Sequence, residues 1–259
     1  MKKIFLAASV LALAFTACKK EDTSGPTNPT DPGTSAKLLK KLTETQNGQM
    51  TVYNFSYDAA KRLTSVKTAD NVESIEFTYD ANGNVTKMEQ KEDNNFRNVY
   101  TYTYNNGVPV SATLKSWELT AGEPDALYED DVLTYTVTNN LVSKINVNMK
   151  LINTAVDFEL TYANNNLSKI VATGTQGFDY SASFTYGDKK PVYPRVFNYV
   201  MDPSGYAVQF FAKNDIRKVV FDLPGTTGDK SITTTYTYDA AGYPLTANDG
   251  STTTKFDYE

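Results

Sequence analysis

The sequence predicts an all-β protein: an antiparallel up-and-down meander of about 13–15 strands, strongly curved or barrel-like. The first observation behind this prediction is a recurring motif of an aromatic residue, Ser or Thr, Tyr, and Asp or Asn, found at 55–58, 77–80, 102–105 and 236–239. The second is a short polar turn after each motif. The third is an aliphatic pair after each turn, such as Leu63 and Val66.

The aromatic runs have the periodicity of β-strands. Tyr53, Phe55 and Tyr57 share one parity, whereas Asn54 and Ser56 share the other. A period of two places the three aromatic rings on one face of a strand and the polar side chains on the other. The same parity recurs in the runs 75–79, 100–104, 133–137, 158–162 and 180–186.

Each run is followed by residues that favour tight turns, at 58–62, 80–84, 105–107, 139–140, 164–166 and 239–242. Asp and Asn bond to the backbone two residues on, and Gly and Asn tolerate the left-handed conformation. The return strands are 63–66, 85–88, 141–145 and 167–170. Their aliphatic residues lie three or four apart, so either the first covers the hairpin end while the second enters the core, or the strand contains a bulge.

The predicted unit is therefore a hairpin, reused about six or seven times. A lone hairpin is marginally stable in water, so neighbouring hairpins must pair with one another. A sheet of this size must curl, close or split, and we expect its aromatic face to turn inward.

Two segments interrupt the rhythm. The first is a short helical or irregular insertion near 191–205, in which 196–201 could form a helix that plugs an opening or caps the interior. Residues 207–211 then fit a strand or a short helix. The second interruption, 120–131, contains Gly122, Pro124 and several acidic residues and is expected to be a long loop.

The N-terminus is expected to lie outside the fold. Lys2 and Lys3 precede an apolar run, 4–15, that is too short to span a bilayer and suits a secretory signal. The run ends in small residues before Cys18, the only cysteine, and this ending resembles the lipobox of bacterial lipoproteins, with Phe15 where Leu is usual. The resemblance implies a signal peptide over 1–17 and a lipid anchor on Cys18.

Residues 18–37 are expected to form the lipidated Cys and a disordered tether, and 38–259 the β domain. Prolines and glycines without large apolar residues make a stiff spacer. Acyl chains at about 0.8 kcal/mol per buried methylene would anchor the protein durably. The charged stretch 19–22 resembles a surface-export signal of Bacteroidota lipoproteins, and an ordinary solvated tether is the alternative. The expected location is the outer membrane, at its surface or periplasmic face.

The motif at 57–66, and its second copy at 79–88, resembles the YD repeat of the Rhs and teneurin class. With the lipobox and the ending 235–244, the chain is similar to uncharacterised Bacteroidota lipoproteins described as having a porin-like fold. The resemblance implies a curved β-meander and no established activity. This chain has too few repeats for the closed shell that Rhs proteins build.

Composition excludes several chemistries. The chain has no histidine, which removes Ser-His-Asp and Cys-His systems and nearly all zinc-type sites. Without Lys2 and Lys3, basic residues fall from 25 to 23 against 30 acidic residues, a net charge near −7. Acids and bases are interspersed, so we expect no nucleic-acid partner. We also expect no cofactor, no metal site and no catalytic residue.

Aromatic residues outside the repeat pattern are the candidates for ligand contact, with structural capping as the alternative: Trp117, Tyr193, Phe197, Tyr199 and Tyr206. The first functional hypothesis is a non-catalytic, membrane-anchored module, tethered through Cys18, that binds a glycan or a protein. The alternative is an integral outer-membrane β-barrel with its aromatic face toward lipid. A second alternative is a carboxylate-based glycan-processing enzyme, since that chemistry needs only paired acids.

Overall fold

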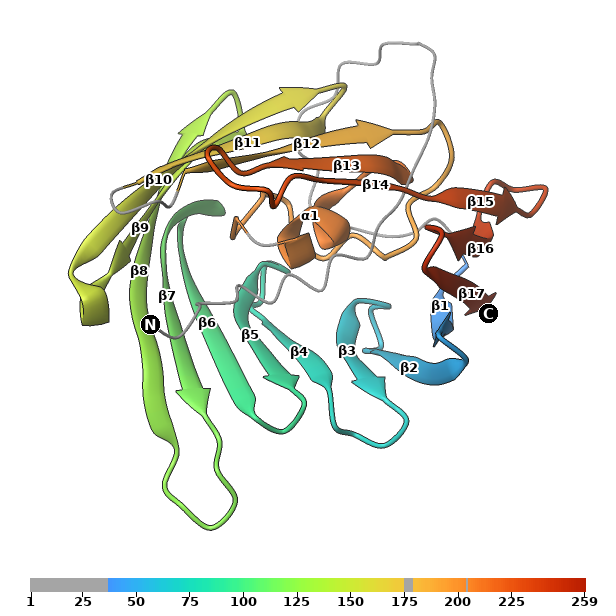
Figure 1. Ribbon diagram of the computed structural model, residues 1–259, viewed down its shortest axis with the longest axis horizontal. Coiled ribbons are helices and arrows are strands. Elements are labelled where there is room, and N and C mark those ends of the chain that lie inside the picture. The colour runs from blue at the N-terminus through green and yellow to red at the C-terminus, as the bar shows by residue number, and fades with distance from the viewer. Residues whose placement is uncertain (1–36, 175–178, 204) are drawn as a thin grey trace.

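The computed structural model describes residues 37–174, 179–203 and 205–259, with only the backbone of 205–206. Within these residues the chain forms one 17-stranded antiparallel sheet that is barrel-like and nearly closed, with one short helix, α1, in its interior (Figure 1). The all-β prediction is confirmed. The strand number exceeds the expected 13–15, in part because Thr234 divides one extended stretch into β14 and β15.

The elements follow one another along the chain as β1 (Leu39–Gln46), β2 (Gln49–Tyr57), β3 (Leu63–Thr68), β4 (Ser74–Tyr79), β5 (Val85–Glu92), β6 (Phe96–Asn105), β7 (Val108–Glu118), β8 (Ala126–Thr138), β9 (Leu141–Met149), the 3-10 turn η1 (Lys150–Ile152), β10 (Thr154–Ala163), β11 (Asn166–Gly174), β12 (Tyr180–Tyr186), α1 (Gly205–Phe211), β13 (Ile216–Asp222), β14 (Lys230–Thr233), β15 (Thr235–Tyr238), β16 (Pro244–Asn248) and β17 (Thr252–Tyr258).

The first and last strands close the sheet. β1 pairs with β2 on one side and with β17 on the other, so that Leu42 faces both Tyr53 and Phe256. Leu38 and Glu259 exchange two backbone hydrogen bonds, of 3.0 and 2.9 Å. The discontinuity lies at Thr234, where the stretch 230–238 leaves β13 as its partner and joins β16.

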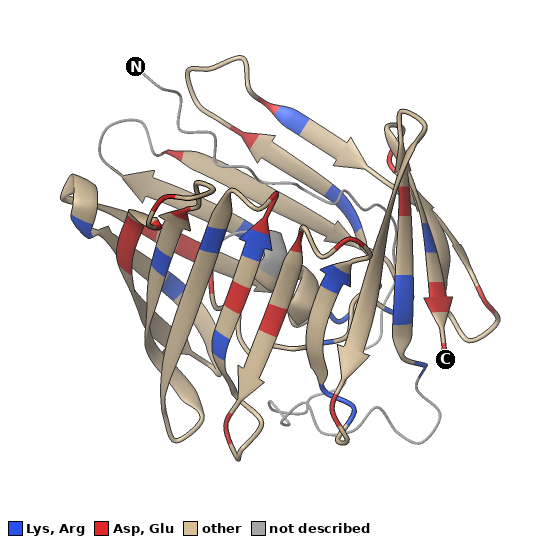
Figure 2. Ribbon diagram, turned by 90° about the horizontal axis from the view of Figure 1, so that it is seen from below, with Lys and Arg blue, Asp and Glu red and all other residues tan. Residues whose placement is uncertain are grey.

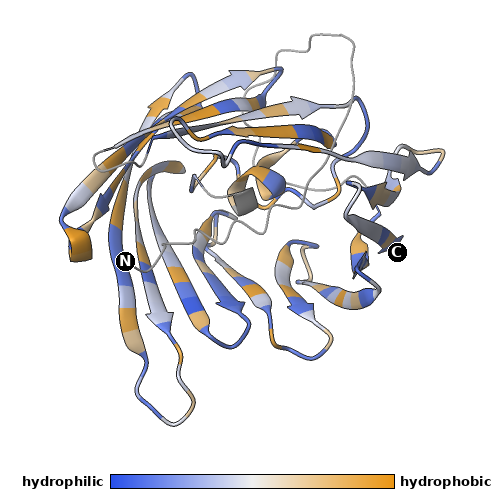
Figure 3. Cartoon of the chain, in the orientation of Figure 1, coloured by the Kyte–Doolittle hydropathy of each residue, from blue (hydrophilic) through white to orange (hydrophobic). Residues whose placement is uncertain are grey.

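The aromatic face turns inward, as the parity predicts. Phe55, Phe77 and Leu133 are almost fully buried, and apolar and polar residues alternate along the strands (Figure 3). Charged residues of both signs are spread over the strands (Figure 2), and some form outward pairs such as Lys67 with Glu76. A barrel with its aromatic face toward lipid is therefore not what this chain builds. The part of the chain that the structure describes contains no helix long and apolar enough to cross a membrane.

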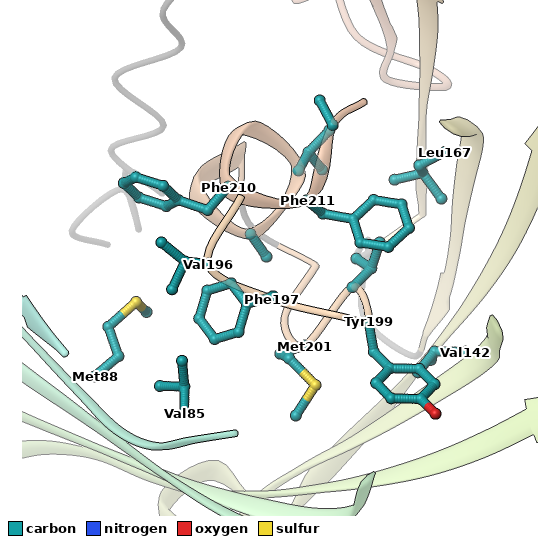
Figure 4. Packing of buried hydrophobic residues seen from close by; sticks show 14 of the residues in the cluster. Val85, Met88, Val142, Leu167, Val196, Phe197, Tyr199, Met201, Phe210 and Phe211 are labelled. Carbon is teal, nitrogen blue, oxygen red and sulfur yellow. The ribbon is translucent and has the colours of Figure 1, made fainter. Parts of the chain in front are cut away.

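The insertion between β12 and β13 fills the barrel interior. Val196, Phe197 and Met201 lie between α1 and the sheet residues Val85 and Met88 (Figure 4), and all five are buried. The expected helix over 196–201 is wrong: this stretch is irregular, and the helix is Gly205–Phe211. The expected short helical or irregular insertion near 191–205 is confirmed, and it packs into the interior of the barrel as part of one core with the sheet residues.

The interruption at 120–131 is shorter than predicted. Residues 126–131 belong to β8, and only the turn 119–125 separates it from β7. Glu129, Asp130 and Asp131 are therefore residues of β8, and consecutive side chains point to opposite faces of the sheet. Gly122 and Pro124 in the preceding turn led to the prediction of a longer loop.

The repeat tyrosines join each hairpin to the next. We call six of them the seam tyrosines: Tyr57, Tyr79, Tyr104, Tyr162, Tyr186 and Tyr236. Each hydroxyl donates to a backbone carbonyl near the end of an earlier strand, at 2.6–3.1 Å, and the acceptors are Leu39, Leu63, Val85, Val142, Leu167 and Ile216 in the same order.

These bonds occur where neighbouring hairpins diverge. The β3–β4 ladder ends at Ser65 and Glu76, and the Tyr79 hydroxyl then reaches past it to the Leu63 carbonyl. A buried carbonyl without a partner is costly, so each hydroxyl both satisfies that group and closes the seam. Val137 holds the corresponding place in β8, and Tyr135 instead donates to the Met201 carbonyl of the insertion at 2.6 Å.

The remaining motif residues shape the turn. The Asp58 carboxylate accepts backbone N–H bonds from Ala60 and Arg62, both at 2.9 Å, and Asp80 and Asp239 do the same in their own turns. The third residue after each Asp has a positive φ: Lys61, Gly83 and Gly242. The turn role predicted for the aspartates is therefore confirmed.

A bulge explains the aliphatic spacing. Tyr57 pairs with Leu63 but Ser56 with Ser65, so Thr64 has no partner across the ladder. Leu63 and Val66 are consequently both buried. The hydroxyls of the bulged residues Thr64, Thr86, Ser143 and Ser168 donate to carbonyls of the facing strand at 2.9–3.3 Å.

We predict that Tyr79→Phe destabilises the fold by about 1–2 kcal/mol, because the ring is kept while the Leu63 carbonyl loses its partner. Urea unfolding followed by circular dichroism measures this change. Tyr128→Phe is the control and should shift the unfolding free energy by less than about 0.5 kcal/mol, since that ring is 48% exposed. Equal effects of the two substitutions would contradict the role of the seam tyrosines.

Candidate functional site

A cavity opens at one end of the barrel, between β1–β5 and the insertion. It has a volume of about 320 Å³, and we call it the mouth cavity. Its lining includes Glu73 and Asp93, from the β3–β4 and β5–β6 connections, so it lies at the end opposite the Tyr-Asp turns. Its lining consists of an apolar floor and a polar rim.

The floor of the mouth cavity is apolar and aromatic, formed by Leu42, Phe55, Val66, Ile75, Tyr193 and Phe210. Tyr193 lies between two other rings, with centroids 6.0 Å from Phe55 and 5.4 Å from Phe210. The aromatic parity of β2 supplies Phe55, while the insertion and α1 supply Tyr193 and Phe210. The floor therefore depends on the insertion packing inside the barrel.

The rim is acidic. It holds Glu44, Glu73, Glu92 and Asp93 against one base, Lys91, and the polar lining is completed by Tyr53, Ser74, Gln90 and Gln209. The Tyr53 hydroxyl donates to Glu73 at 3.0 Å. The side-chain amides of Gln90 and Asn98 donate to Glu92 at 2.7 and 3.3 Å. The Oε1 atom of Glu44 is buried and has no hydrogen-bond partner among the described residues.

The site raises the pKa of its glutamates. Burial, with the nearby carboxylates of Glu73 and Asp249, raises the pKa of Glu44 to about 7. Burial also raises the pKa of Glu73, to which Asp93 adds repulsion, although the Tyr53 hydroxyl opposes the rise. The pKa of Glu92 is raised by burial and by Asp93 and Glu73. Carboxyl groups with shifted pKa values in a cleft mark a candidate functional site.

The sequence-predicted ligand contacts do not come together. Tyr193 lies in the mouth cavity. Trp117 is a half-buried residue of β7 that does not line the cavity, although its cross-strand partner Arg97 pairs in turn with the rim residue Lys91. The Arg97 guanidinium lies 4.5 Å from the centroid of the Trp117 ring. Phe197 and Tyr199 are 2% and 6% exposed, because the insertion packs into the barrel, a placement that fits the structural alternative given for them.

Two other candidates cannot be placed. Tyr206 belongs to α1, but its side chain lies outside the described residues, as does all of Cys18.

The acidic stretch 129–131 does not converge on one point. Asp130 pairs with Lys150 at 3.2 Å, whereas Asp131 is only 5% exposed and lies on the inward parity of β8. Over the ranges that the structure describes, no three acidic, His or Cys side chains are grouped so as to hold a metal ion.

Sequence reasoning missed the acidic rim. Glu44, Glu73 and Glu92 are separated along the chain and sit in unremarkable polar surroundings. Register was the signal for two of them, because Glu73 and Glu92 flank the predicted strands 75–79 and 85–88 on the side away from the Tyr-Asp turns. No strand was predicted around Glu44. Strand pairing around a closing sheet brings them to one mouth.

Comparison with known proteins supports the repeat and the fold. The RHS Repeat family model matches residues 57–94, which contain the motifs at Tyr57 and Tyr79. The fold is similar to crystal structures of porin-like proteins from Bacteroides vulgatus ATCC 8482 (TM-score 0.55, 12% identity, 86% of this chain and 99% of that chain) and Bacteroides uniformis ATCC 8492 (TM-score 0.51, 15% identity, 85% and 96%). No curated protein matches the sequence.

These similarities confirm a YD-repeat stretch and a porin-like barrel architecture, as the sequence resemblance implied. At such low identity they establish the fold alone. The fold and the site therefore define a β-barrel with a filled interior and an acidic mouth, in which residues 57–94 match the RHS Repeat.

The raised pKa of Glu44 makes stability depend on pH. The folded protein keeps a proton that the unfolded chain releases between its pKa of 4.5 and about 7, so this contribution is present at low pH and is lost as pH rises through that window. We predict that Glu44→Gln raises the unfolding free energy by on the order of 2 kcal/mol at pH 8 and by much less at pH 5.

Urea titrations at the two pH values measure this difference. Glu76→Gln is the matched control, because Glu76 lies on the outer face of β4 and its side chain is 52% exposed. A pH-independent effect of Glu44→Gln would refute the assignment.

Proposed function

We propose that the protein is a lipid-anchored, non-catalytic binding module that takes a glycan or protein ligand at its mouth cavity. The observation that carries the proposal is the cavity itself, an aromatic floor under a polar rim on a scaffold fixed by sheet pairing. Cavities with apolar walls and a few convergent polar groups are the usual ligand sites of proteins.

The place where the chain enters the barrel supports an orientation in which the mouth cavity faces away from the membrane. Lys37 pairs with Asp239 at 2.6 Å, beside a Tyr-Asp turn, and Leu38 is bonded to Glu259. A tether running from Cys18 to this point would reach the barrel at the end opposite the mouth cavity. The cavity would then face away from the membrane, toward a ligand.

The inward aromatic face favours a tethered module over an integral outer-membrane barrel. An integral barrel needs an apolar band on its outer surface. The outer surface here carries charge pairs midway along strands, such as Lys144 with Asp157 at 2.9 Å. Durable attachment would instead come from the acyl chains on Cys18.

The gathering of Glu44, Glu73 and Glu92 in one cavity is the observation that favours the second alternative, a carboxylate-based glycan-processing enzyme. Glu44, with a pKa near 7, could act as the proton donor and an ionised neighbour as its partner. The two proposals differ in the fate of a bound glycan, which a binding module releases unchanged.

The anchor is tested by metabolic labelling with a fatty-acid analogue followed by membrane fractionation. We expect Cys18→Ser to lose the label and to leave the membrane fraction, because the thiol is the only attachment point for acyl chains. Thr23→Ser, in the same segment, is the control and should keep both properties. Retention of Cys18→Ser in the membrane without label would contradict the anchor and favour integration.

The binding role is tested with glycan arrays and with pull-downs from outer-membrane extracts. We expect Tyr193→Ala to weaken capture of any ligand found by about tenfold or more, because it removes the central ring of the cavity floor. Trp117→Ala is the comparison, since Trp117 lies outside the cavity, and thermal melts establish that both variants fold. Loss of capture with Trp117→Ala alone would move the site to β7, and cleavage of the captured glycan would favour the enzyme.

A further inference from the structure

We infer that the mouth cavity binds an organic cation, an ammonium or guanidinium group carried on an apolar stem. The inference deepens the proposed function, because it takes the mouth cavity as the ligand site. It is carried by the charge of the rim, by the aromatic floor and by an acceptor without a partner.

The rim has an excess of negative charge and of hydrogen-bond acceptors. Four carboxyl groups face one ammonium group, that of Lys91, which is solvent-exposed. An ionised carboxylate accepts hydrogen bonds and donates none, so the rim favours a ligand that has several N–H donors. A bound anion would meet repulsion from all four acids.

Two of the half-buried rim acids already have protein donors. Glu73 accepts from Tyr53, and Glu92 accepts from Gln90 and Asn98. Glu44 differs, because its Oε1 is buried without a donor while Glu73 and Asp249 add negative charge near it. A cation placed there would supply both the missing donor and the counter-charge that burial makes valuable.

The floor suits the stem of such a ligand. Phe55, Tyr193 and Phe210 present a continuous aromatic wall, with successive centroids 6.0 and 5.4 Å apart. Ring faces attract cations, and apolar stems of lysine and arginine type bury well against them. The volume of about 320 Å³ suits one group of side-chain size rather than an extended chain.

The same chemistry has two sources, a free alkyl amine and a lysine or arginine side chain of a protein. Isothermal titration of the purified full-length protein at pH 8 distinguishes them, using 1,5-diaminopentane and a peptide with one central lysine. We expect at least one of these to bind and 1-pentanol, the neutral probe, to bind about tenfold more weakly or worse. Tighter binding of the peptide would identify the ligand as a side chain of a protein, and tighter binding of the diamine would identify it as a free alkyl amine.

Charge removal provides the decisive variants. Glu44→Gln and Glu73→Gln should each weaken the better amine about tenfold, while Glu76→Gln, outside the cavity, should leave its affinity unchanged. Affinity should also fall about tenfold from pH 8 to pH 6, because Glu44 takes up a proton near pH 7. The groups around it that set this dependence are Glu73, Asp249, Glu92, Asp93 and Lys91.

The inference is overturned if 1-pentanol binds as tightly as the amines, if both glutamate variants bind like the unmodified protein, or if neither amine binds at millimolar concentration. A glycan or protein that still binds in a Tyr193-dependent way would then preserve the binding role while removing the cation. Loss of both kinds of binding would remove the proposed function itself.

Discussion

The architecture depends on one repeated hydrogen bond, from a tyrosine hydroxyl to a carbonyl near the end of an earlier strand. Backbone ladders hold strands together within a hairpin, but adjacent hairpins splay apart toward the Tyr-Asp turns. The hydroxyl bridges that opening, and the bulge beside it lets both aliphatic residues face inward. The aspartate, the left-handed turn residue and the Thr or Ser hydroxyl serve the same junction. The residues of the repeat thus supply the contacts that join one hairpin to the next in this region.

The local character of these contacts explains which features could be predicted from the sequence. Strand parity placed Phe55 and Phe77 in the core, and turn chemistry assigned Asp58 and Asp80 their roles. The helix at 196–201 was misplaced, because a proline-flanked apolar run has no intrinsic period and takes its shape from the barrel that surrounds it. The acidic rim was missed for a related reason, since Glu44 and Glu92 meet only through the pairing of several intervening strands.

The two ends of the barrel differ in structure. The end with the Tyr-Asp turns carries the regular, repeated bonds, and there Lys37, the first described residue, pairs with Asp239. The other end holds the mouth cavity, where burial and neighbouring carboxylates raise the pKa of the half-buried Glu44 and Glu92. Keeping these groups ionised there costs free energy of folding. Retaining carboxyl groups at such a cost is typical of sites selected for binding or chemistry. The insertion couples the two ends, since it fills the core and also supplies Tyr193 to the cavity floor.

Closure of the sheet by β1 and β17 has a consequence for biosynthesis. A chain that emerges from its N-terminus presents β1 first, yet one edge of that strand has no partner until the final residues arrive. Hairpins can form one after another as the chain is synthesised, whereas the ring can be sealed only at the end. An exposed strand edge is a template for pairing with other chains. The interval between the appearance of β1 and that of β17 is therefore when the nascent protein most needs a chaperone.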